Sequence, residues 1–402
     1  MDRRTFLNQS GGAALALGAL GSSARAADDD SSAGKEIRLG LVGCGGRGSW
    51  IAKLFEGSGR YVLASVVDYF PEKAGAVGEA HGVAAERRFS GLQGYARMLD
   101  AGGLDAVAII SPPYFHPEQA AAAVEAGVAI YLAKPVAVDV PGTRSIERSA
   151  GEAAGKGLPF LVDFQTRNDP FFVEAMRRVH EGALGEMCFG ESAYHAGRLQ
   201  IQRAPGTPEA RLSNWVFDRA LSGDIITEQN IHTLDVMSWA MGVAPVRATG
   251  TGGRKVRTDV GDCWDHFALT FEYPDGVGIA FTSRQFEAHG APGGIRNRMF
   301  GSRGVLETEY GGRVLIRGNE GTFYQGGETG AIYQEGTVRN ITAFADAIAA
   351  GDTSNPTVAP SVQSNFVTIL GRSAAYQGNT VSWDEMMASD TPIEADLTGL
   401  KA

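Results

Sequence analysis

Residues 37–55 read I-R-L-G-L-V-G-C-G-G-R-G-S-W-I-A-K-L-F, and this stretch decides the fold. The apolar residues at 37–42 predict a short buried strand, and the apolar spacing at 51–55 predicts one face of a following helix. A turn rich in glycine lies between them. A strand, a glycine turn and a helix in this order are typical of the first unit of a doubly wound parallel sheet.

The turn has the spacing G-x-G-x-x-G on Gly43, Gly45 and Gly48, with Gly46 and Arg47 before the third glycine. In a dinucleotide site the first glycine makes the tight turn and the second lets the backbone approach the pyrophosphate. The third lets the helix pack against the strand. The pyrophosphate binds at the helix N-terminus, where free N–H groups favour an anion. We therefore expect these residues to bind a dinucleotide.

The next predicted strand, Y-V-L-A-S-V-V at 61–67, ends at Asp68. An acid about twenty residues beyond the glycine turn accepts hydrogen bonds from the ribose hydroxyls and disfavours a 2′-phosphate. The simpler interpretation, an aspartate that only ends a strand, stays open. The sequence favours NAD as cofactor over NADP.

The chain then continues to alternate between strands and helices. Strands are predicted at 105–110, 128–132 and 159–162, and helices at 118–126 and 141–156. This alternation predicts parallel βαβ units, and so a Rossmann-type dinucleotide-binding domain over residues 36–163.

Ligands of such sheets bind beyond the carboxyl ends of the strands. Ser111, Pro112 and His116 follow one strand, and Lys134 follows the next. We therefore expect these residues at the nicotinamide end of the cofactor. For His116 two interpretations remain open: it faces the nicotinamide, or it only starts the next helix.

After Phe164 longer runs alternate apolar and polar residues, as strands with one solvated face do. Y-P-D-G at 273–276 indicates a hairpin turn. Residues 164–402 are therefore predicted to form an α+β substrate and oligomerisation domain with an open, mostly antiparallel sheet. Its C-terminal helices could pack back on the first domain.

The beginning of the chain predicts export. Arg3 and Arg4 precede a short apolar run at 11–20 and an A-R-A cleavage pattern at 24–26. This pattern predicts a twin-arginine signal peptide over residues 1–26, followed by a flexible lead-in at 27–35, and hence a periplasmic or otherwise exported protein. An ordinary signal peptide with two chance arginines is the alternative. The apolar run is too short for a membrane span.

The composition of the chain argues against several classes of binding partner. A net charge of −10 argues against nucleic acid or an anionic membrane surface. Three widely spaced cysteines imply no disulfide framework, and no Cys/His group has zinc spacing. We expect no metal and no stable membrane span.

Glu228, His232 and Asp235 are spaced i, i+4 and i+7 on a predicted helix, so we expect all three on one face. Histidine suits proton transfer near neutral pH, and a carboxylate one turn away could orient its ring. For His232 an interior structural role is the alternative, and for Asp235 the structural interpretation is the better one.

Several stretches, in this order and spacing, resemble the Gfo/Idh/MocA oxidoreductase family over nearly the whole chain beyond the signal peptide. They are G-C-G-G-R-G at 43–48, V-V-D at 66–68, S-P-P-Y-F-H at 111–116, A-K-P at 133–135, F-Q-T-R-N-D-P at 164–170, G-D-I-I-T-E-Q-N-I-H-T-L-D at 223–235, G-S-R-G-V-L-E at 301–307 and N-I-T-A-F-A-D-A-I-A-A-G at 340–351. The resemblance implies NAD(P)-dependent oxidation or reduction of sugars, cyclitols and related polyols. It also implies a homodimer or homotetramer through the open sheet, His232 as general base, and Lys134 polarising the substrate oxygen.

Two positions depart from the family pattern. Ala133 stands where the family usually has glutamate before the Lys-Pro pair, and Glu228 stands where it usually has aspartate. The first change leaves Lys134 without its nearest carboxylate in the sequence. The second keeps the charge on a longer side chain.

Weaker candidates lie elsewhere in the second half. Arg167 and Asn168 could bind substrate hydroxyls or cap a helix, Tyr194 and His195 end a predicted strand near the cleft, and Trp215 could stack on a sugar ring. Packing or a place in the cleft wall is the better interpretation for each.

The sequence is compatible with three functions. The leading one is an NAD-dependent oxidoreductase acting on a secondary hydroxyl of a sugar, glycoside or cyclitol, with a tightly bound, internally recycled cofactor. The first alternative is a redox-neutral glycosidase that oxidises its sugar transiently. Lys134-Pro135 argues against it, because the glycosidases related to this family lack the Lys-Pro element. The second alternative is a non-enzymatic sugar- or NAD-binding protein, which would not need both Lys134 and His232.

Overall fold

The structure, a computed structural model, describes residues 36–354 and 356–402. The predicted signal peptide and lead-in lie outside the described residues. Residues Glu36–Ala402 form one compact unit. No helix of the described residues has both the length and the apolar content that a membrane crossing requires.

The first sheet has six strands in the order β3-β2-β1-β4-β5-β6, and every neighbouring pair is parallel. This order confirms the predicted Rossmann-type sheet. Sequence patterning missed only β3, which has three residues and no fully buried side chain. The strands are β1 (Ile37–Val42), β2 (Tyr61–Asp68), β3 (Arg88–Ser90), β4 (Ala106–Ile109), β5 (Ala129–Ala133) and β6 (Phe160–Asp163).

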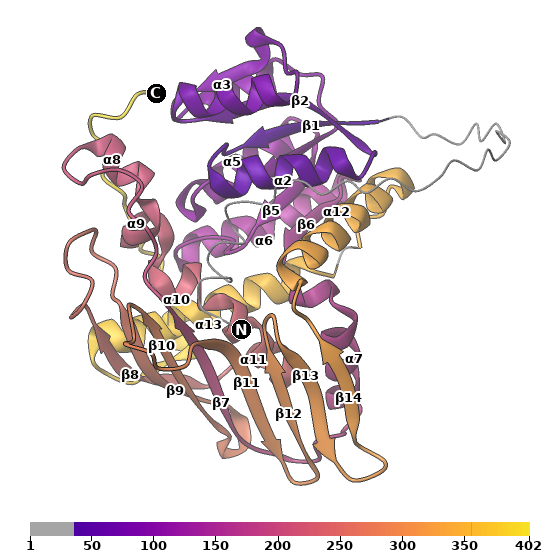
Figure 1. Ribbon diagram of the computed structural model, residues 1–402, viewed down its shortest axis with the longest axis vertical. Helices are drawn as coiled ribbons and strands as arrows, with labels where there is room; N and C mark the ends of the chain where they lie inside the picture. The colour runs from indigo at the N-terminus through magenta and orange to yellow at the C-terminus, as the bar shows by residue number, and fades with distance from the viewer. Residues whose placement is uncertain (1–35, 355) are drawn as a thin grey trace, which may run out of the picture. The chain divides into compact units, whose positions relative to one another are not determined.

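Helices cover this sheet because its central strands are apolar on both faces; every residue of β4 and β5 is buried. The crossover helices are α2 (Gly46–Gly57), α3 (Pro71–Ala80), α4 (Gly94–Asp100), α5 (His116–Glu125) and α6 (Val140–Gly155). A later helix, α12 (Ile332–Ala350), joins them: its Ile341 and Phe344 share a buried core with Phe55 of α2 and Tyr131 of β5. In Figure 1 this orange helix lies beside the sheet.

The second sheet has nine strands in the order β14-β13-β12-β11-β7-β10-β9-β8-β15. Only β7 and β10 pair in parallel, so the sheet is mostly antiparallel, as predicted. The predicted hairpin at 273–276 joins β9 to β10. The strands are β7 (Met187–Ala196), β8 (Arg247–Gly253), β9 (His266–Glu272), β10 (Gly278–Gln285), β11 (Gly294–Gly301), β12 (Gly304–Glu309), β13 (Arg313–Gly318), β14 (Tyr324–Glu328) and β15 (Val381–Ser382).

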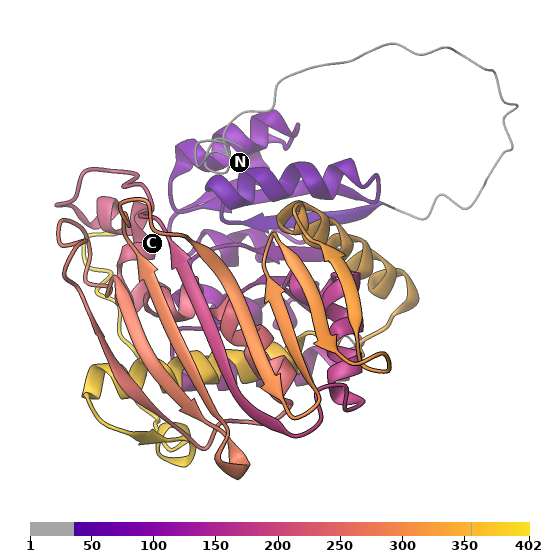
Figure 2. The same cartoon turned by 60° about the horizontal axis from the view of Figure 1, so that its bottom comes forward.

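Helices pack on one face of the second sheet: α7 (Pro170–His180), α11 (Ile231–Met241) and α13 (Val358–Gln377). Figure 2 shows the opposite face of the strands without a covering helix. The strands alternate accordingly; in β9 buried and exposed side chains follow one another along the chain.

A run of short helices links β7 to α11: α8 (Pro208–Ser213), a 3-10 turn (Trp215–Phe217), α9 (Arg219–Ser222) and α10 (Asp224–Glu228). The single helix expected over 228–235 was wrong. α10 ends at Glu228 and α11 begins at Ile231, with Asn230 at its N-cap position. The side chain of Asn230 makes no capping hydrogen bond, so the break is not explained by its side chain, and Glu228 and His232 lie on different helices.

Candidate active site

The glycine turn has the geometry of a dinucleotide cradle. Gly43 has φ +96°, and a Cβ there would lie 2.8 Å from the carbonyl oxygen of Ile110. A Cβ on Gly48 would lie 1.8 Å from the carbonyl oxygen of Gly43, so α2 can pack on β1 only with glycine here. At Gly45 and Gly46 a Cβ would meet no atom within 4 Å. The N-terminus of α2 therefore faces open space, as a pyrophosphate site requires.

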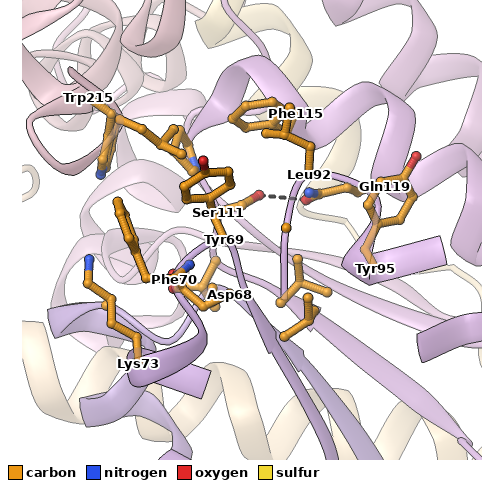
Figure 3. A pocket seen from close by; sticks show the side chains of 18 residues that line it. Asp68, Tyr69, Phe70, Lys73, Leu92, Tyr95, Ser111, Phe115, Gln119 and Trp215 are labelled. Carbon is orange, nitrogen blue, oxygen red and sulfur yellow. Dashed lines mark hydrogen bonds between the residues drawn. The ribbon is translucent and has the colours of Figure 1, made fainter. Parts of the chain in front are cut away.

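Asp68 lies at the end of β2 in a pocket beside this turn (Figure 3). Its two carboxylate oxygens accept backbone hydrogen bonds from Cys44 (2.8 Å) and Phe70 (2.9 Å). Each oxygen keeps a further lone pair that could accept a ribose hydroxyl. The residues present therefore fit an NAD molecule whose adenosine half occupies this pocket and whose pyrophosphate lies at Gly45 and Gly46.

Ser111 and Pro112 line the same pocket, and Ser111 Oγ donates to Gln119 at 2.5 Å. His116 does not line it. Its ring is fully buried, with Nδ1 2.9 Å from the carbonyl oxygen of Pro135 and Nε2 2.8 Å from that of Ser111. Burial lowers the pKa of His116 to about 4. His116 is the first residue of α5, and its buried ring bridges the loop after β4 and the loop after β5.

Lys134 follows β5, and its ammonium reaches the second half of the chain. Nζ donates to the main-chain carbonyl of Glu228 at 2.7 Å and lies 3.5 Å from its carboxylate. Burial lowers the pKa of Lys134, and the negative charge of Glu228 opposes this shift. Glu228 thus supplies the carboxylate that Ala133 does not.

His232 lies in the first turn of α11 between two aromatic rings, Phe164 (centroids 6.3 Å apart) and Tyr310 (5.2 Å). Its Nδ1 is buried without a hydrogen-bond partner among the described residues. Burial lowers the pKa of His232 well below its usual range, and the charges of Lys134 and Arg47 lower it further. The imidazole is therefore neutral at neutral pH and can accept a proton.

The side chain of Arg47 extends from the glycine turn toward the end of β6 and toward α12. Its guanidinium pairs with Asp163 at the end of β6 and donates to the hydroxyl of Tyr333 at 2.8 Å. It also lies over the ring of Trp50, 5.5 Å from the centroid. The G-x-G-x-x-G pattern does not predict these contacts, and neither Tyr310 nor Tyr333 carries a local signal for the site.

The side chains of Tyr194 and His195, near the end of β7, point to opposite faces of the sheet. Tyr194 is buried, on the face of the sheet that packs against helices, and its pKa is raised by burial and then by the charge of Glu228. Neighbouring side chains on a strand point to opposite faces. His195 accordingly contacts Thr282 Oγ1 at 3.0 Å on the other face of the sheet, away from the site.

Arg167 and Asp235 form an ion pair with each other. The guanidinium makes two hydrogen bonds to the carboxylate, at 2.8 and 2.9 Å, and Ser364 donates to the same carboxylate at 2.7 Å. Asp235 is fully buried, which supports its structural interpretation. Asn168 does not cap α7 either, since Asp169 holds that position.

Trp215 lies elsewhere than expected for a sugar-stacking residue. It lines the pocket of Asp68 and Phe70, at the adenosine end of the cofactor site (Figure 3). Leu212 lines the same wall. The structure therefore places Leu212 and Trp215 in the pocket of Asp68.

A Rossmann sheet with an open glycine cradle, an acid after β2 and a lysine after β5 is typical of a nucleotide-dependent oxidoreductase. The family comparison agrees. The NAD-binding Rossmann fold of the GFO/IDH/MocA oxidoreductases matches residues 37–162, and the C-terminal domain of that family matches residues 172–307. The chain belongs to the GFO/IDH/MocA family and is an oxidoreductase with NAD as cofactor.

The chain is similar to an inositol 2-dehydrogenase of Rhizobium meliloti strain 1021, with 25% identity over 64% of this chain and 74% of the relative. Two solved structures share its fold. One is the aldose-aldose oxidoreductase from Caulobacter crescentus complexed with glycerol (TM-score 0.68, 19% identity, 87% of this chain and 100% of that one). The other is a myo-inositol 2-dehydrogenase from Lactobacillus plantarum (TM-score 0.68, 20% identity, 87% and 99%).

Proposed function

We propose that this protein oxidises a secondary hydroxyl of a sugar, glycoside or cyclitol, with an NAD that stays bound and is recycled in place. One observation carries the proposal: the main-chain carbonyl of Glu228, four residues before His232, accepts a hydrogen bond of 2.7 Å from the ammonium of Lys134, which follows a strand of the sheet that carries the open dinucleotide cradle. Lys134 and His232 are the two groups that we assign to the reaction. The two groups supply the two functions that alcohol oxidation needs from a protein.

Oxidation of a carbinol breaks its O–H and C–H bonds. NAD, when bound, supplies the acceptor for the hydride that leaves carbon. Neutral His232 takes the hydroxyl proton, and its lowered pKa keeps the imidazole unprotonated near neutral pH, as a base must be. The ammonium of Lys134 donates a hydrogen bond to the same oxygen and stabilises the negative charge that grows there. The reverse sequence reduces a ketone.

The activities named for two similar proteins support a sugar or a cyclitol as the substrate class. The relative from Rhizobium meliloti is an inositol 2-dehydrogenase, and the structural neighbour from Caulobacter crescentus is an aldose-aldose oxidoreductase. Cyclitols and aldoses both present secondary hydroxyls in a ring. Half-buried Tyr310, whose ring centroid lies 5.2 Å from that of His232, offers an aromatic surface for such a ring.

Export is part of the proposal. The twin-arginine pattern at Arg3 and Arg4 would send the chain out of the cytoplasm already folded. NAD is not expected outside the cytoplasm, so the cofactor would travel inside the protein. It would then have to be regenerated by a second substrate or by the reverse half of the same reaction.

We also propose a homodimer or homotetramer through the face of the second sheet that no helix covers. Phe189 and Phe300 stack on neighbouring strands, with ring centroids 4.4 Å apart, and the side chain of Phe189 is 47% exposed. Exposed aromatic pairs of this kind are typical of protein interfaces. Light scattering of the purified protein tests this part.

The test of the function uses protein purified without added nucleotide. Denaturation should release NAD(H), and one of a panel of aldoses, cyclitols and aryl glycosides should change the redox state of the bound nucleotide. Absence of both bound nucleotide and NAD affinity would overturn the proposal. Release of an aglycone with no net redox change would instead support the redox-neutral glycosidase. NAD binding without any turnover would support a binding protein.

A further inference from the structure

The adenosine pocket has two walls that come from distant parts of the chain. Asp68, Phe70 and Leu92 form one wall from the Rossmann sheet, and Leu212 and Trp215 form the other. The first wall follows β2 and β3, whereas the second belongs to the linker between β7 and α11. Side chains of both walls share one apolar cluster, which includes Phe70, Leu212 and Leu221.

A third segment, residues 391–402, joins the two walls. In Figure 1 the yellow end of the chain runs past α9 and α8 toward the Rossmann sheet. Its side chains alternate: Ile393, Ala395 and Leu397 are half-buried, and the residues between them are exposed. Ala395, Leu397 and Leu400 pack against the apolar cluster of the two walls. A segment that turns its apolar side chains inward at every second position has a defined docking face.

Hydrogen bonds fix this segment to both walls. On the Rossmann side the amide of Leu92 donates to the carbonyl of Lys401 at 3.0 Å, and the amide of Lys401 donates to the hydroxyl of Tyr69 at 3.1 Å. On the other side Arg211 donates to the carbonyl of Asp396. Since Tyr69 and Leu92 themselves line the pocket, the segment bonds directly to pocket residues.

The close approach at Leu92 is built into the backbone. Gly91 has φ +84°, and a Cβ there would lie 2.3 Å from the carbonyl oxygen of Ala402. Glycine therefore permits the segment to reach the loop after β3. Residues 391–402 also lie outside both stretches that match the family's domains, 37–162 and 172–307.

We infer that residues 391–402 tie the two walls of the adenosine pocket together and so retain NAD between turnovers, with Leu397 and Leu400 as the positioning residues. This inference rests on the proposed function, because it explains how the cofactor stays bound. Movement of the wall of Leu212 and Trp215 away from the wall of Phe70 would open the pocket for release of NAD. The tie must detach from one wall before they separate.

The test measures cofactor release rather than turnover. Protein loaded with NADH is mixed with excess NAD⁺, and the loss of bound-NADH fluorescence gives the dissociation rate. Leu397→Ser combined with Leu400→Ser should raise this rate at least about tenfold, because both changes remove apolar contacts on the docking face. The matched control is Glu394→Ala with Thr398→Ala, two exposed positions of the same segment, and should stay within about twofold of the unaltered protein.

Two further measurements keep the test decisive. A chain ending at Ser389 removes the segment entirely and should release NADH at least as fast as the double leucine variant. In the unaltered protein, saturating NAD should slow hydrogen exchange of the Leu92 and Lys401 amides. Unchanged release rates in both variants, or exchange that NAD does not affect, would overturn the inference. A protein that binds NAD and transfers hydride but fails these tests keeps the proposed function, whereas one that never binds NAD loses both.

Discussion

The ammonium of Lys134 lies 2.7 Å from the main-chain carbonyl oxygen of Glu228 and 3.5 Å from its carboxylate. Lys134 follows the fifth strand of the Rossmann sheet, and Glu228 ends a short helix of the second half. The charge partner of the lysine therefore comes from across the site instead of from position 133. The contact therefore joins the loop after β5 to the end of α10.

Lys134→Met removes the ammonium and keeps a side chain of similar length. We expect kcat to fall by about 10²- to 10³-fold, the usual loss when one charge-stabilising donor is removed. NAD should still bind, because the cradle at Gly45 and Asp68 is unchanged. Steady-state kinetics and a nucleotide titration separate the two effects. A variant that turns over normally would exclude Lys134 from the chemistry.

Glu228→Gln tests how the carboxylate controls Lys134. The charge of Glu228 raises the pKa of Lys134 against the lowering effect of burial, so its removal lowers that pKa further. The ammonium is then lost at a lower pH, and the alkaline limb of the kcat/KM profile should move toward acid. Glu228→Asp keeps the charge and should leave the limb nearer its original position. An alkaline limb that does not move in Glu228→Gln would contradict this account.

His232→Asn tests the base. Burial and the charges of Lys134 and Arg47 lower the pKa of His232 well below the ordinary 6.5, so the imidazole stays neutral in mildly acidic solution. The acid limb of kcat/KM in the unaltered protein should therefore lie below pH 6.5. The variant should lose about 10²- to 10⁴-fold in kcat together with that limb. An acid limb that persists in the variant would assign the base to another residue.

Gly48→Ala and Gly45→Ala separate folding from cofactor binding. A methyl group at position 48 would lie 1.8 Å from a carbonyl oxygen, so α2 must shift, and we expect the free energy of unfolding to fall by about 1–3 kcal/mol. A methyl group at position 45 meets no protein atom within 4 Å. Gly45→Ala should therefore keep its melting temperature and lose NAD affinity, since the methyl enters the space of the pyrophosphate. Equal NAD affinity in Gly45→Ala and the unaltered protein would place the pyrophosphate elsewhere.

Asp235→Asn tests the structural interpretation of this residue. The substitution leaves the guanidinium of Arg167, whose side chain is only 10% exposed, without its charge partner. Breaking a buried ion pair in this way costs about 3–5 kcal/mol of stability. Urea unfolding should show that loss, while kcat per folded molecule stays near its original value. A selective loss of kcat with normal stability would instead make Asp235 part of the catalytic machinery.

The sequence predicted those features that local patterning controls. The apolar runs that became β1, β4 and β5 are buried on both sides, and the glycine spacing at 43–48 reports a steric need that the structure confirms at Gly43 and Gly48. The sequence did not predict β3, because a strand of three half-buried residues has no alternation of apolar and polar positions. The sequence did not predict the break between α10 and α11, because the i, i+4, i+7 spacing of Glu228, His232 and Asp235 continues across it.

Long-range partners could not be predicted in this way. Nothing near Arg47 in the sequence points to Asp163 and Tyr333, and nothing near Trp215 points to the pocket of Asp68. The opposite orientations of Tyr194 and His195 depend on which face of β7 packs against helices, and this follows only once the sheet is assembled. The sequence therefore offered candidate residues for the site, and it did not predict their long-range partners.

The central claim is that the Lys134 and His232 site transfers hydride between a ring hydroxyl and a bound NAD. The most direct measurement adds aldoses and cyclitols to purified, NAD-loaded protein and follows the near-ultraviolet absorbance of bound NADH. We expect NADH to form in the unaltered protein with at least one substrate and not in Lys134→Met, although both hold equal amounts of nucleotide. Equal reduction in the two proteins, or a purified protein that holds and binds no nucleotide, would contradict the claim.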